Sequence, residues 1–232
     1  HKCAAVFCVS EFIKKKFLEG IKGNFEKIHV LHNGVERKLT KFPKKKKEVL
    51  FVGRLVPEKG VHFYVEAVKA IAHKHPQWNF GLIGSFKLGD NNNRNFYSDT
   101  IIKKIRSVGP QAQFYGFQDQ KFVEEKMKSA SIVIVPSVWE EPFGLVAAEA
   151  MSNGACIIAS KVGGIPEIIR DNGILIDNIN QRKLSLKIES LIEDKKMRQN
   201  YQRRAWKNFE LSSNISSNKL DSFRKTIFLD YF

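Results

Sequence analysis

Long apolar runs are missing from this sequence, and so are the cysteine patterns of disulfide-rich or zinc-binding proteins. No uninterrupted apolar stretch reaches the roughly 18 residues of a membrane-spanning helix, and stretches such as Ser131–Ser137 have only the length of a strand. Cys3, Cys8 and Cys156 form no C-x-x-C pair, and the histidines show no metal-ligand spacing. These absences predict a protein with no membrane span, disulfide framework or zinc site, located in a reducing cytoplasm.

Acidic residues are scarce relative to basic ones. The 39 Lys and Arg outnumber the 24 Asp and Glu, and the resulting formal charge of +15 favours anionic partners. The densest basic runs, Lys14–Lys16 and Lys44–Lys47, suit either a solvated surface or peripheral contact with an anionic membrane at its inner face. Basic residues do not alternate with aromatic ones, and no helix-turn-helix, zinc-finger or RNP-like pattern occurs, so we expect no nucleic-acid partner.

This sequence does not begin with methionine, and its first residues do not have the pattern of a signal peptide. The chain opens at His1 without a charged segment followed by an apolar one, which favours an N-terminus that has been cut away over a secretory signal. The 232 residues, 43% of them hydrophobic, suffice for one domain with a sizeable core plus some flanking chain.

From Glu48 onward, short β-rich apolar runs alternate with stretches of helical period. This alternation is typical of βαβ units with a parallel sheet, and continuous apolar runs indicate strands buried on both faces. The expected strands are Val49–Val52, Trp78–Ile83, Ala112–Tyr115, Ile132–Val135, Ala155–Ala159 and Ile174–Ile176. The expected helices are Val61–His73, Ser98–Ser107, Lys121–Ala130 and Leu145–Ser152. The predicted fold class is therefore α/β, a Rossmann-like parallel sheet with helices on both faces.

The chain divides into three regions of different character. Residues 1–42 contain the strand-like runs Ala4–Val9 and Lys27–Leu31 around a helical piece, and they are expected to be the end of another domain and a linker. Residues 43–210 form the predicted Rossmann-like domain, in which the polar, aperiodic insertion Phe86–Asn95 is expected to be a mobile surface loop. Residues 211–232 form a helical tail, which we expect to pack towards the N-terminal region. The tail needs a surface to cover its aromatic residues, Phe223, Phe228, Tyr231 and Phe232.

The loop after the strand Val49–Val52 carries two cations between two glycines. Arg54 offers a planar guanidinium and Lys59 a point charge, a pair suited to holding and neutralising a diphosphate. Gly53 and Gly60 let the backbone turn and approach a ligand closely. Ligands of open α/β sheets bind beyond the carboxyl ends of the strands, so this loop is a candidate phosphate site; a solvated charged turn is the alternative.

A second candidate segment follows the strand Ile132–Val135. Glu141 and Glu149 are separated by seven residues, and Pro142 lies near the start of the helix expected between them. The N-terminus of such a helix offers free N–H groups and a positive dipole end to a phosphate or a sugar. Taken alone, the two acids are equally consistent with helix residues that the dipole favours.

Taken together, these segments resemble glycosyltransferase family 4, whose enzymes have the two-domain GT-B fold and an EX7E motif. The matching segments, in chain order, are Ser10, Asn33–Val35, Gly53–Gly60, Glu141–Glu149 and Gly163–Glu167. They cover most of residues 8–177. The resemblance implies that the chain is the C-terminal, donor-binding half of such an enzyme with a remnant of the N-terminal acceptor half.

The resemblance also implies a role for individual residues. Arg54 and Lys59 would stabilise the leaving diphosphate, so that neither a metal nor another cofactor is required. Glu141 would lie near the sugar and the reacting face, and is the third residue expected to act in catalysis. Glu149 would hold the ribose hydroxyls, Phe117 would meet the base, and backbone N–H groups at residues 143–145 would face the diphosphate and sugar. The implied donor-binding residues are Gly53, Phe117, Phe143, Gly144, Leu145 and Glu149.

The implied activity is that of a retaining, metal-independent hexosyltransferase. It would move a sugar from a nucleotide-diphosphate sugar, expected to be a UDP-sugar, to a glycan or lipid-linked acceptor in polysaccharide or lipopolysaccharide biosynthesis. The leaving diphosphate is expected to take the acceptor proton on the same face, and Glu141 as a covalent nucleophile is the weaker option. With the acceptor half almost wholly missing, this length of chain alone is expected to be inactive.

Three other functions fit part of the pattern. A nucleotide-sugar-binding module without catalysis remains open. A dinucleotide-dependent oxidoreductase shares the layering but requires G-x-G-x-x-G after the first strand, where Gly53-Arg54-Leu55 stands instead. A glycoside hydrolase pairs two carboxylates but needs no basic diphosphate cradle. A transferase accounts for both the acids and the cations.

Overall fold

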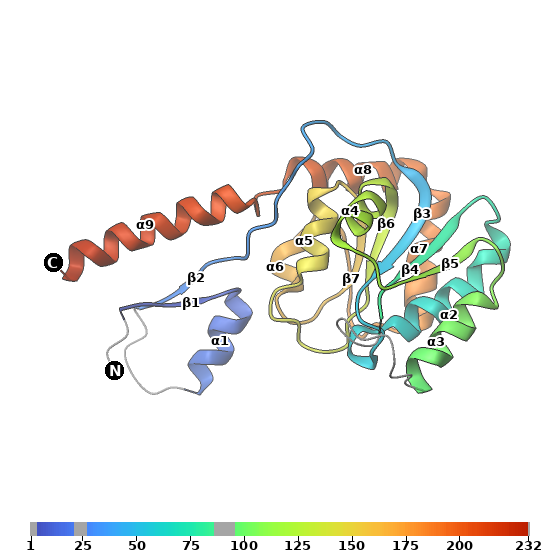
Figure 1. Ribbon diagram of the computed structural model, residues 1–232, viewed down its shortest axis with the longest axis horizontal. Helices are drawn as coiled ribbons and strands as arrows, with labels where there is room; N and C mark the ends of the chain where they lie inside the picture. Colours follow the sequence, from blue (N-terminus) through green and yellow to red (C-terminus); the bar gives the residue numbers. More distant parts are fainter. Residues whose placement is uncertain (1–3, 21–26, 86–95, 232) are drawn as a thin grey trace.

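The computed structural model describes residues 4–20, 27–85 and 96–231 of the chain. In these ranges the strands form two parallel sheets, one of two strands and one of six (Figure 1). The predicted loop Phe86–Asn95 lies outside the described residues. Cys8 and Cys156 are both buried and free.

The six-stranded sheet contains all six of the strands predicted from the sequence, with small shifts at their ends. Its order is β5-β4-β3-β6-β7-β8, and every neighbouring pair is parallel. The strands are β3 (Lys46–Val52), β4 (Asn79–Ile83), β5 (Ala112–Gly116), β6 (Ala130–Val135), β7 (Cys156–Ser160) and β8 (Ile174–Ile176).

Helices cover both faces of this sheet, which confirms the predicted α/β fold class. On one face pack α2 (Val61–Ile71), α3 (Phe96–Arg106) and α7 (Gln181–Glu193). On the other face pack α4 (Gln120–Ser129), α5 (Leu145–Ser152) and α6 (Ile165–Ile169). Helix α8 (Lys195–Lys207) contacts both core clusters, the first through Met197 and Tyr201 and the second through Ala205. Successive side chains of a strand alternate between faces, so Val49 and Phe51 of β3 enter one core cluster and Leu50 enters the other.

The predicted helices are confirmed, and α2 shows why the sequence forms them. Its apolar residues Val61, Tyr64, Val65 and Val68 recur at helical spacing and are all buried against the sheet. Each large apolar side chain buried in this way contributes about 1.5–3 kcal/mol. The short helix α6 was not predicted.

The strand order places a crevice between β3 and β6. From β3 the chain winds outward to β4 and β5, then returns to β6 on the other side and continues outward to β7 and β8. The connections that leave β3 and β6 therefore diverge to opposite faces. In open α/β sheets this topological switch point, at the carboxyl ends of the strands, is where ligands bind.

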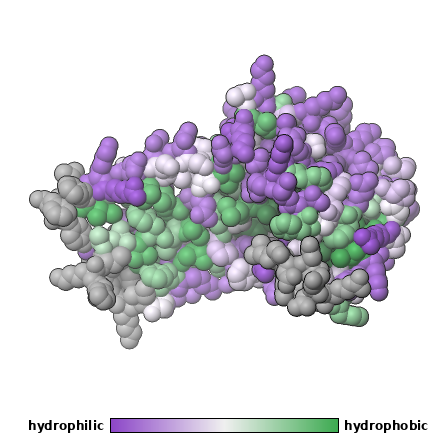
Figure 2. All heavy atoms as spheres, in the orientation of Figure 1, coloured by the Kyte–Doolittle hydropathy of each residue, from purple (hydrophilic) through white to green (hydrophobic). Residues whose placement is uncertain are grey.

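The two-stranded sheet forms a separate small unit with α1. It pairs β1 (Val6–Cys8) with β2 (Ile28–Val30), and α1 (Glu11–Glu19) lies between them in sequence. The C-terminal helix α9 (Ser213–Tyr231) packs on it, since the ring of Phe223 lies 5.4 Å from that of Phe7 and 4.7 Å from that of His29. Figure 2 shows apolar atoms gathered over this end of the molecule.

The lysine run at residues 44–47 is only partly the solvated surface that the sequence suggested. Lys44, Lys46 and Lys47 are exposed. Lys45 instead turns inward, and its ammonium donates hydrogen bonds to the carbonyls of Asn153 (2.7 Å) and Lys128 (2.9 Å), at the C-terminal ends of α5 and α4. Burial lowers the pKa of Lys45 to about 7.

In the described ranges, no helix combines the length and the apolar character that crossing a membrane would require.

Candidate functional site

The loops after β3 and β6 meet at the switch point. The backbone N–H of Val138 donates to the carbonyl of Glu58 at 2.9 Å. Gly60 begins α2 with a φ of 65°, and a Cβ at this position would lie 1.8 Å from the carbonyl oxygen of Pro136. Only glycine combines this conformation with so close an approach, and it thereby brings the basic loop against the acidic one.

Lys59 and Glu141 are in direct contact across these loops. The ammonium of Lys59 donates to Glu141 Oε1, and the hydroxyl of Ser137 donates to the same oxygen at 2.7 Å. Glu141 is 8% exposed, so its charge is largely removed from water and depends on these two partners. The sequence predicted both members of the pair, but it did not single out Ser137, a polar residue just beyond the end of β6.

The backbone of Glu141 is held by the glycine-rich segment after β7. The N–H of Gly164 donates to the carbonyl of Glu141 at 2.7 Å. Gly163 has a φ of 56°, and a Cβ there would lie 2.2 Å from the same carbonyl oxygen. The segment Gly163–Glu167, which matched the family pattern without an assigned role, therefore supports the position of Glu141.

A cavity of about 390 Å³ opens beside this pair. We call it the donor cavity after the role that the sequence predicts for the residues around it. Six of the predicted residues line it, namely Gly53, Lys59, Glu141, Phe143, Gly144 and Leu145. Gly144 caps α5 with a φ of 101° and supplies no side-chain acceptor, so the first N–H groups of this helix have no side-chain cap. Val9 and Asn33 contribute to the wall from the N-terminal region, a contribution that the sequence did not reveal.

Three predicted residues lie outside the donor cavity. Arg54 is exposed on the loop after β3, and Phe117, at the end of the edge strand β5, is 59% exposed. Glu149 lines a neighbouring groove of about 370 Å³, between α4, α5 and the linker Gly34–Leu39. Leu145 borders both spaces, so the groove and the donor cavity adjoin at the N-terminus of α5.

The carboxyl group of Glu149 has a raised pKa and is available to bind a ligand. Burial raises its pKa, and the nearby charge of Glu124 raises it further. Lys38 pairs with Glu124 at 3.0 Å. Within the described ranges, no hydrogen bond or ion pair engages the carboxyl group of Glu149. Glu149 can therefore accept hydrogen bonds from a ligand in the groove.

The small unit of β1, α1 and β2 makes hydrogen bonds to the segments that follow β6 and β7. The carboxylate of Glu167 accepts the N–H groups of Glu11 and Phe12 at 2.7 Å each, which satisfies the N-terminus of α1. The hydroxyl of Ser10 donates to the carbonyl of Pro142 at 2.6 Å, directly beside Glu141. His32 Nε2 lies 3.5 Å from Glu167 Oε2. The sequence assigned no such contact to Glu167.

Metal-ligating side chains do not cluster in the donor cavity of the described structure. Among the described residues, the group of three that could hold a metal ion is His75, Glu189 and Glu193. His75 precedes β4 and the two acids lie in the last turns of α7, so the group belongs to the amino edge of the sheet, opposite the cavity.

Residues 34–208 match the family described as Glycosyl transferases group 1. An uncharacterized glycosyltransferase of Methanocaldococcus jannaschii is 34% identical over 195 residues, which make up 83% of this chain and 51% of the relative. Spore coat protein SA of Bacillus subtilis is 32% identical over 66% of this chain and 41% of its own length. The chain spans about half the length of the curated relatives that it matches.

Solved structures share the fold. HepE of Anabaena, in complex with UDP and glucose, superposes with a TM-score of 0.78 at 22% identity, covering 96% of this chain and 63% of HepE. A glycosyltransferase from Rickettsia africae gives a TM-score of 0.80 at 23% identity, covering 97% and 63%. The fold is thus that of the GT-B half predicted from the sequence. With the family pattern matching most of its length, the chain belongs to the group 1 glycosyltransferases.

Proposed function

We propose that the protein to which this chain belongs transfers a sugar from a nucleotide-diphosphate sugar, with a UDP-sugar as the expected donor. The observation that carries the proposal is the contact of Lys59 with Glu141 in a cavity that faces the uncapped N-terminus of α5. HepE, which shares this fold, was solved with UDP and glucose and with UDP-glucose, and this supports the choice of donor.

The diphosphate would be held by cations and by helix N–H groups. Lys59 is neutralised by Glu141, and a pyrophosphate placed between Lys59 and α5 would draw the flexible ammonium towards itself. The N–H groups at the start of α5 then supply hydrogen bonds to the phosphate oxygens. Arg54 stands exposed on the same loop as Lys59 and would add a second positive charge.

The nucleoside would extend from the donor cavity into the adjoining groove. Glu149 lines that groove with a carboxyl group that has no partner among the described residues, and it would accept hydrogen bonds from the ribose hydroxyls. The exposed ring of Phe117 would meet the base. Leu145 borders both spaces and marks the path between them.

In the proposed reaction the bond between the sugar C1 and the diphosphate oxygen breaks, and a bond from C1 to the acceptor oxygen forms on the same face. The acceptor proton passes to an oxygen of the leaving diphosphate. Lys59 and Arg54 would stabilise the charge that develops there, so that no metal ion is needed. Glu141 would lie beside the sugar, and covalent attack by its carboxylate is the weaker alternative.

The acceptor is proposed to be a glycan or a lipid-linked sugar, as in polysaccharide or lipopolysaccharide synthesis. A lipopolysaccharide 1,2-N-acetylglucosaminetransferase of Salmonella typhimurium is 29% identical over 53% of this chain, which supports this class of acceptor. The second candidate function is binding of the nucleotide sugar without transfer. It applies to this length of chain, which corresponds to about half of the relatives.

Calorimetric titration with UDP tests the donor site. Arg54→Ala, Lys59→Ala and Glu149→Ala should each weaken UDP binding by at least about tenfold, because each removes a charged hydrogen-bonding group. Lys69→Ala, at an exposed position on α2, is the matched control and should bind as the unchanged chain does. UDP affinity that stays the same in all three site variants rejects the assignment.

Transfer and binding are separated by a turnover assay on the full-length protein. A screen of UDP-, GDP- and ADP-sugars that detects transfer without added divalent metal, and in the presence of a chelator, would support the proposed mechanism. Donor binding without transfer to any glycan or lipid-linked acceptor would leave the binding module as the correct function.

A further inference from the structure

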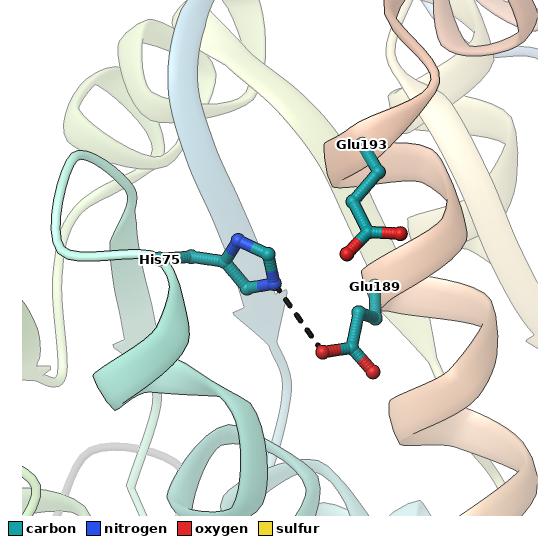
Figure 3. Close-up of side chains that lie close together, drawn as sticks. All are labelled: His75, Glu189 and Glu193. Atoms are coloured by element: carbon teal, nitrogen blue, oxygen red, sulfur yellow. Dashed lines mark ion pairs between the residues drawn. The ribbon is translucent and has the colours of Figure 1, made fainter.

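Three potential metal ligands from distant parts of the sequence lie together at the amino edge of the large sheet. His75 follows the 3-10 turn Ala72–Lys74 and precedes β4, whereas Glu189 and Glu193 lie on α7. One ligand atom from each lies within 4.8 Å of the other two. Figure 3 shows the imidazole of His75 pointing at Glu189, with Glu193 one turn further along the same side of the helix.

The imidazole is buried and incompletely satisfied. The side chain of His75 is 9% exposed, and its Nε2 has no hydrogen-bond partner among the described residues. The nearest acidic atom is Glu189 Oε1, at 3.5 Å. In a tetrahedral zinc site with bonds of about 2.1 Å, neighbouring ligand atoms lie about 3.4 Å apart. The two atoms are therefore already spaced as two ligands of one ion would be.

The two carboxylates are unfavourably placed without a cation. Like charges four residues apart on a helix repel, and acids in the last turns face the negative end of the helix dipole. Arg198 caps the carbonyls of Leu191 and Ile192, but it does not reach these side chains. In the described structure the cation at the carboxylates is Lys74, whose ammonium lies 2.9 Å from Glu189 Oε1 with a half-exposed side chain.

We propose that His75, Glu189 and Glu193 bind a divalent transition-metal ion, with Zn²⁺ as the expected ion, and that this ion ties the turn before β4 to α7. An imidazole with two carboxylates suits zinc and its neighbours, whereas Mg²⁺ and Ca²⁺ prefer oxygen ligands alone. Glu193 is exposed and can rotate to complete a three-ligand set, which leaves the fourth position to water. The site lies opposite the donor cavity and does not depend on the function proposed for it.

Titration of the protein with Zn²⁺ tests this site. Glu193→Gln should weaken binding by more than about tenfold, since loss even of an outer-shell partner costs that much. Glu193 is exposed, so this variant should fold normally. His73→Ala, at an exposed histidine of the same turn, is the matched control and should keep the affinity of the unchanged chain.

Lys74→Met gives the sharper result, because it should strengthen Zn²⁺ binding. It removes the cation that competes for Glu189, and the gain should be up to about fivefold, the equivalent of an exposed ion pair. Circular dichroism must show that this variant is folded, because a misfolded chain would expose the buried Cys8 and Cys156, which also bind Zn²⁺. The proposal is overturned if Glu193→Gln binds Zn²⁺ as tightly as the unchanged chain, or if Lys74→Met leaves the affinity unchanged or lowers it.

Discussion

The large sheet and the small β1–β2 unit are held together by different forces. In the large sheet, Trp78 and Phe80 are at most 1% exposed and are surrounded by apolar side chains. In the small unit, Phe7 is 36% exposed and α1 has no buried residue. Its attachment to the large sheet combines the packing of Val9 against the core with polar contacts such as those of Glu167 and Ser10. Apolar burial thus stabilises the large sheet, while directional hydrogen bonds help to set where the small unit lies.

The same truncation in the two regions should therefore have unequal effects. Phe80→Ala should lower the free energy of unfolding by about 3–5 kcal/mol, because it leaves a cavity in the core. Phe7→Ala should lower it by about 1 kcal/mol or less, because that ring already contacts water. Urea unfolding of both variants measures the difference. If both variants lose the same free energy of unfolding, the small unit has an apolar core of its own, and the two regions are stabilised in the same way.

A second comparison concerns Lys45, which precedes β3 where the linker enters the large sheet. Its ammonium is bound there by backbone carbonyls. Its pKa is lowered to about 7, from an unfolded value of about 10.5. Between these pH values the unfolded chain holds a proton on this lysine that the folded chain does not. The free energy of unfolding should therefore rise with pH across this window, by up to about 1.4 kcal/mol per pH unit from this residue. Below pH 7 this residue should add no pH dependence, because it is protonated in both states.

Lys45→Met removes this titration. The stability of the unchanged chain relative to the variant, measured by urea unfolding at several pH values from 7 to 10, should increase with pH. Lys44→Met changes an exposed neighbour, so its free energy of unfolding should vary with pH in the same way as that of the unchanged chain. A flat difference for Lys45→Met would mean that its three carbonyl acceptors keep the ammonium charged in the fold.

The most local effect is expected at the attachment of α1. Glu167→Gln keeps one acceptor oxygen but loses the charge that two N–H groups share, which should cost about 1–2 kcal/mol locally. Hydrogen exchange of the Glu11 and Phe12 amides should become faster, while exchange in β3 stays unchanged. Unchanged exchange at both amides would show that the carboxylate does not hold the helix.

The strands of the large sheet were predictable because each is a continuous apolar run between turn residues. Strands β6 and β7 each carry a single polar side chain, and β3 is apolar from Val49 to Val52, the part that was predicted. The helix α6 escaped prediction because its five residues, with Pro166 in the first turn, are too few to show a period. Lys45 was misread as solvated because a lysine run gives no sign of which member meets buried carbonyls.

The site was predictable where short segments carry the chemistry themselves. Lys59 and Glu141 were named from their loops, and the strand order then brought those loops together. Ser137 was not named because a single serine after a strand carries no pattern of its own. Asn33 was matched to the family pattern without a place in the cavity, and Val9 was not named, because both reach the cavity from a segment far away in the chain. The contact of His75 with Glu189 could not be predicted for the same reason. The two residues are more than a hundred positions apart, and the packing of α7 beside α2 brings them together.

The most direct test of the site is a crystal structure of the chain with bound UDP. The arrangement described above predicts that the pyrophosphate lies within hydrogen-bond distance of Lys59 Nζ and of the first N–H groups of α5, and that Lys59 has moved away from Glu141. A pyrophosphate bound outside the donor cavity, with the contact between Lys59 and Glu141 intact, would contradict it.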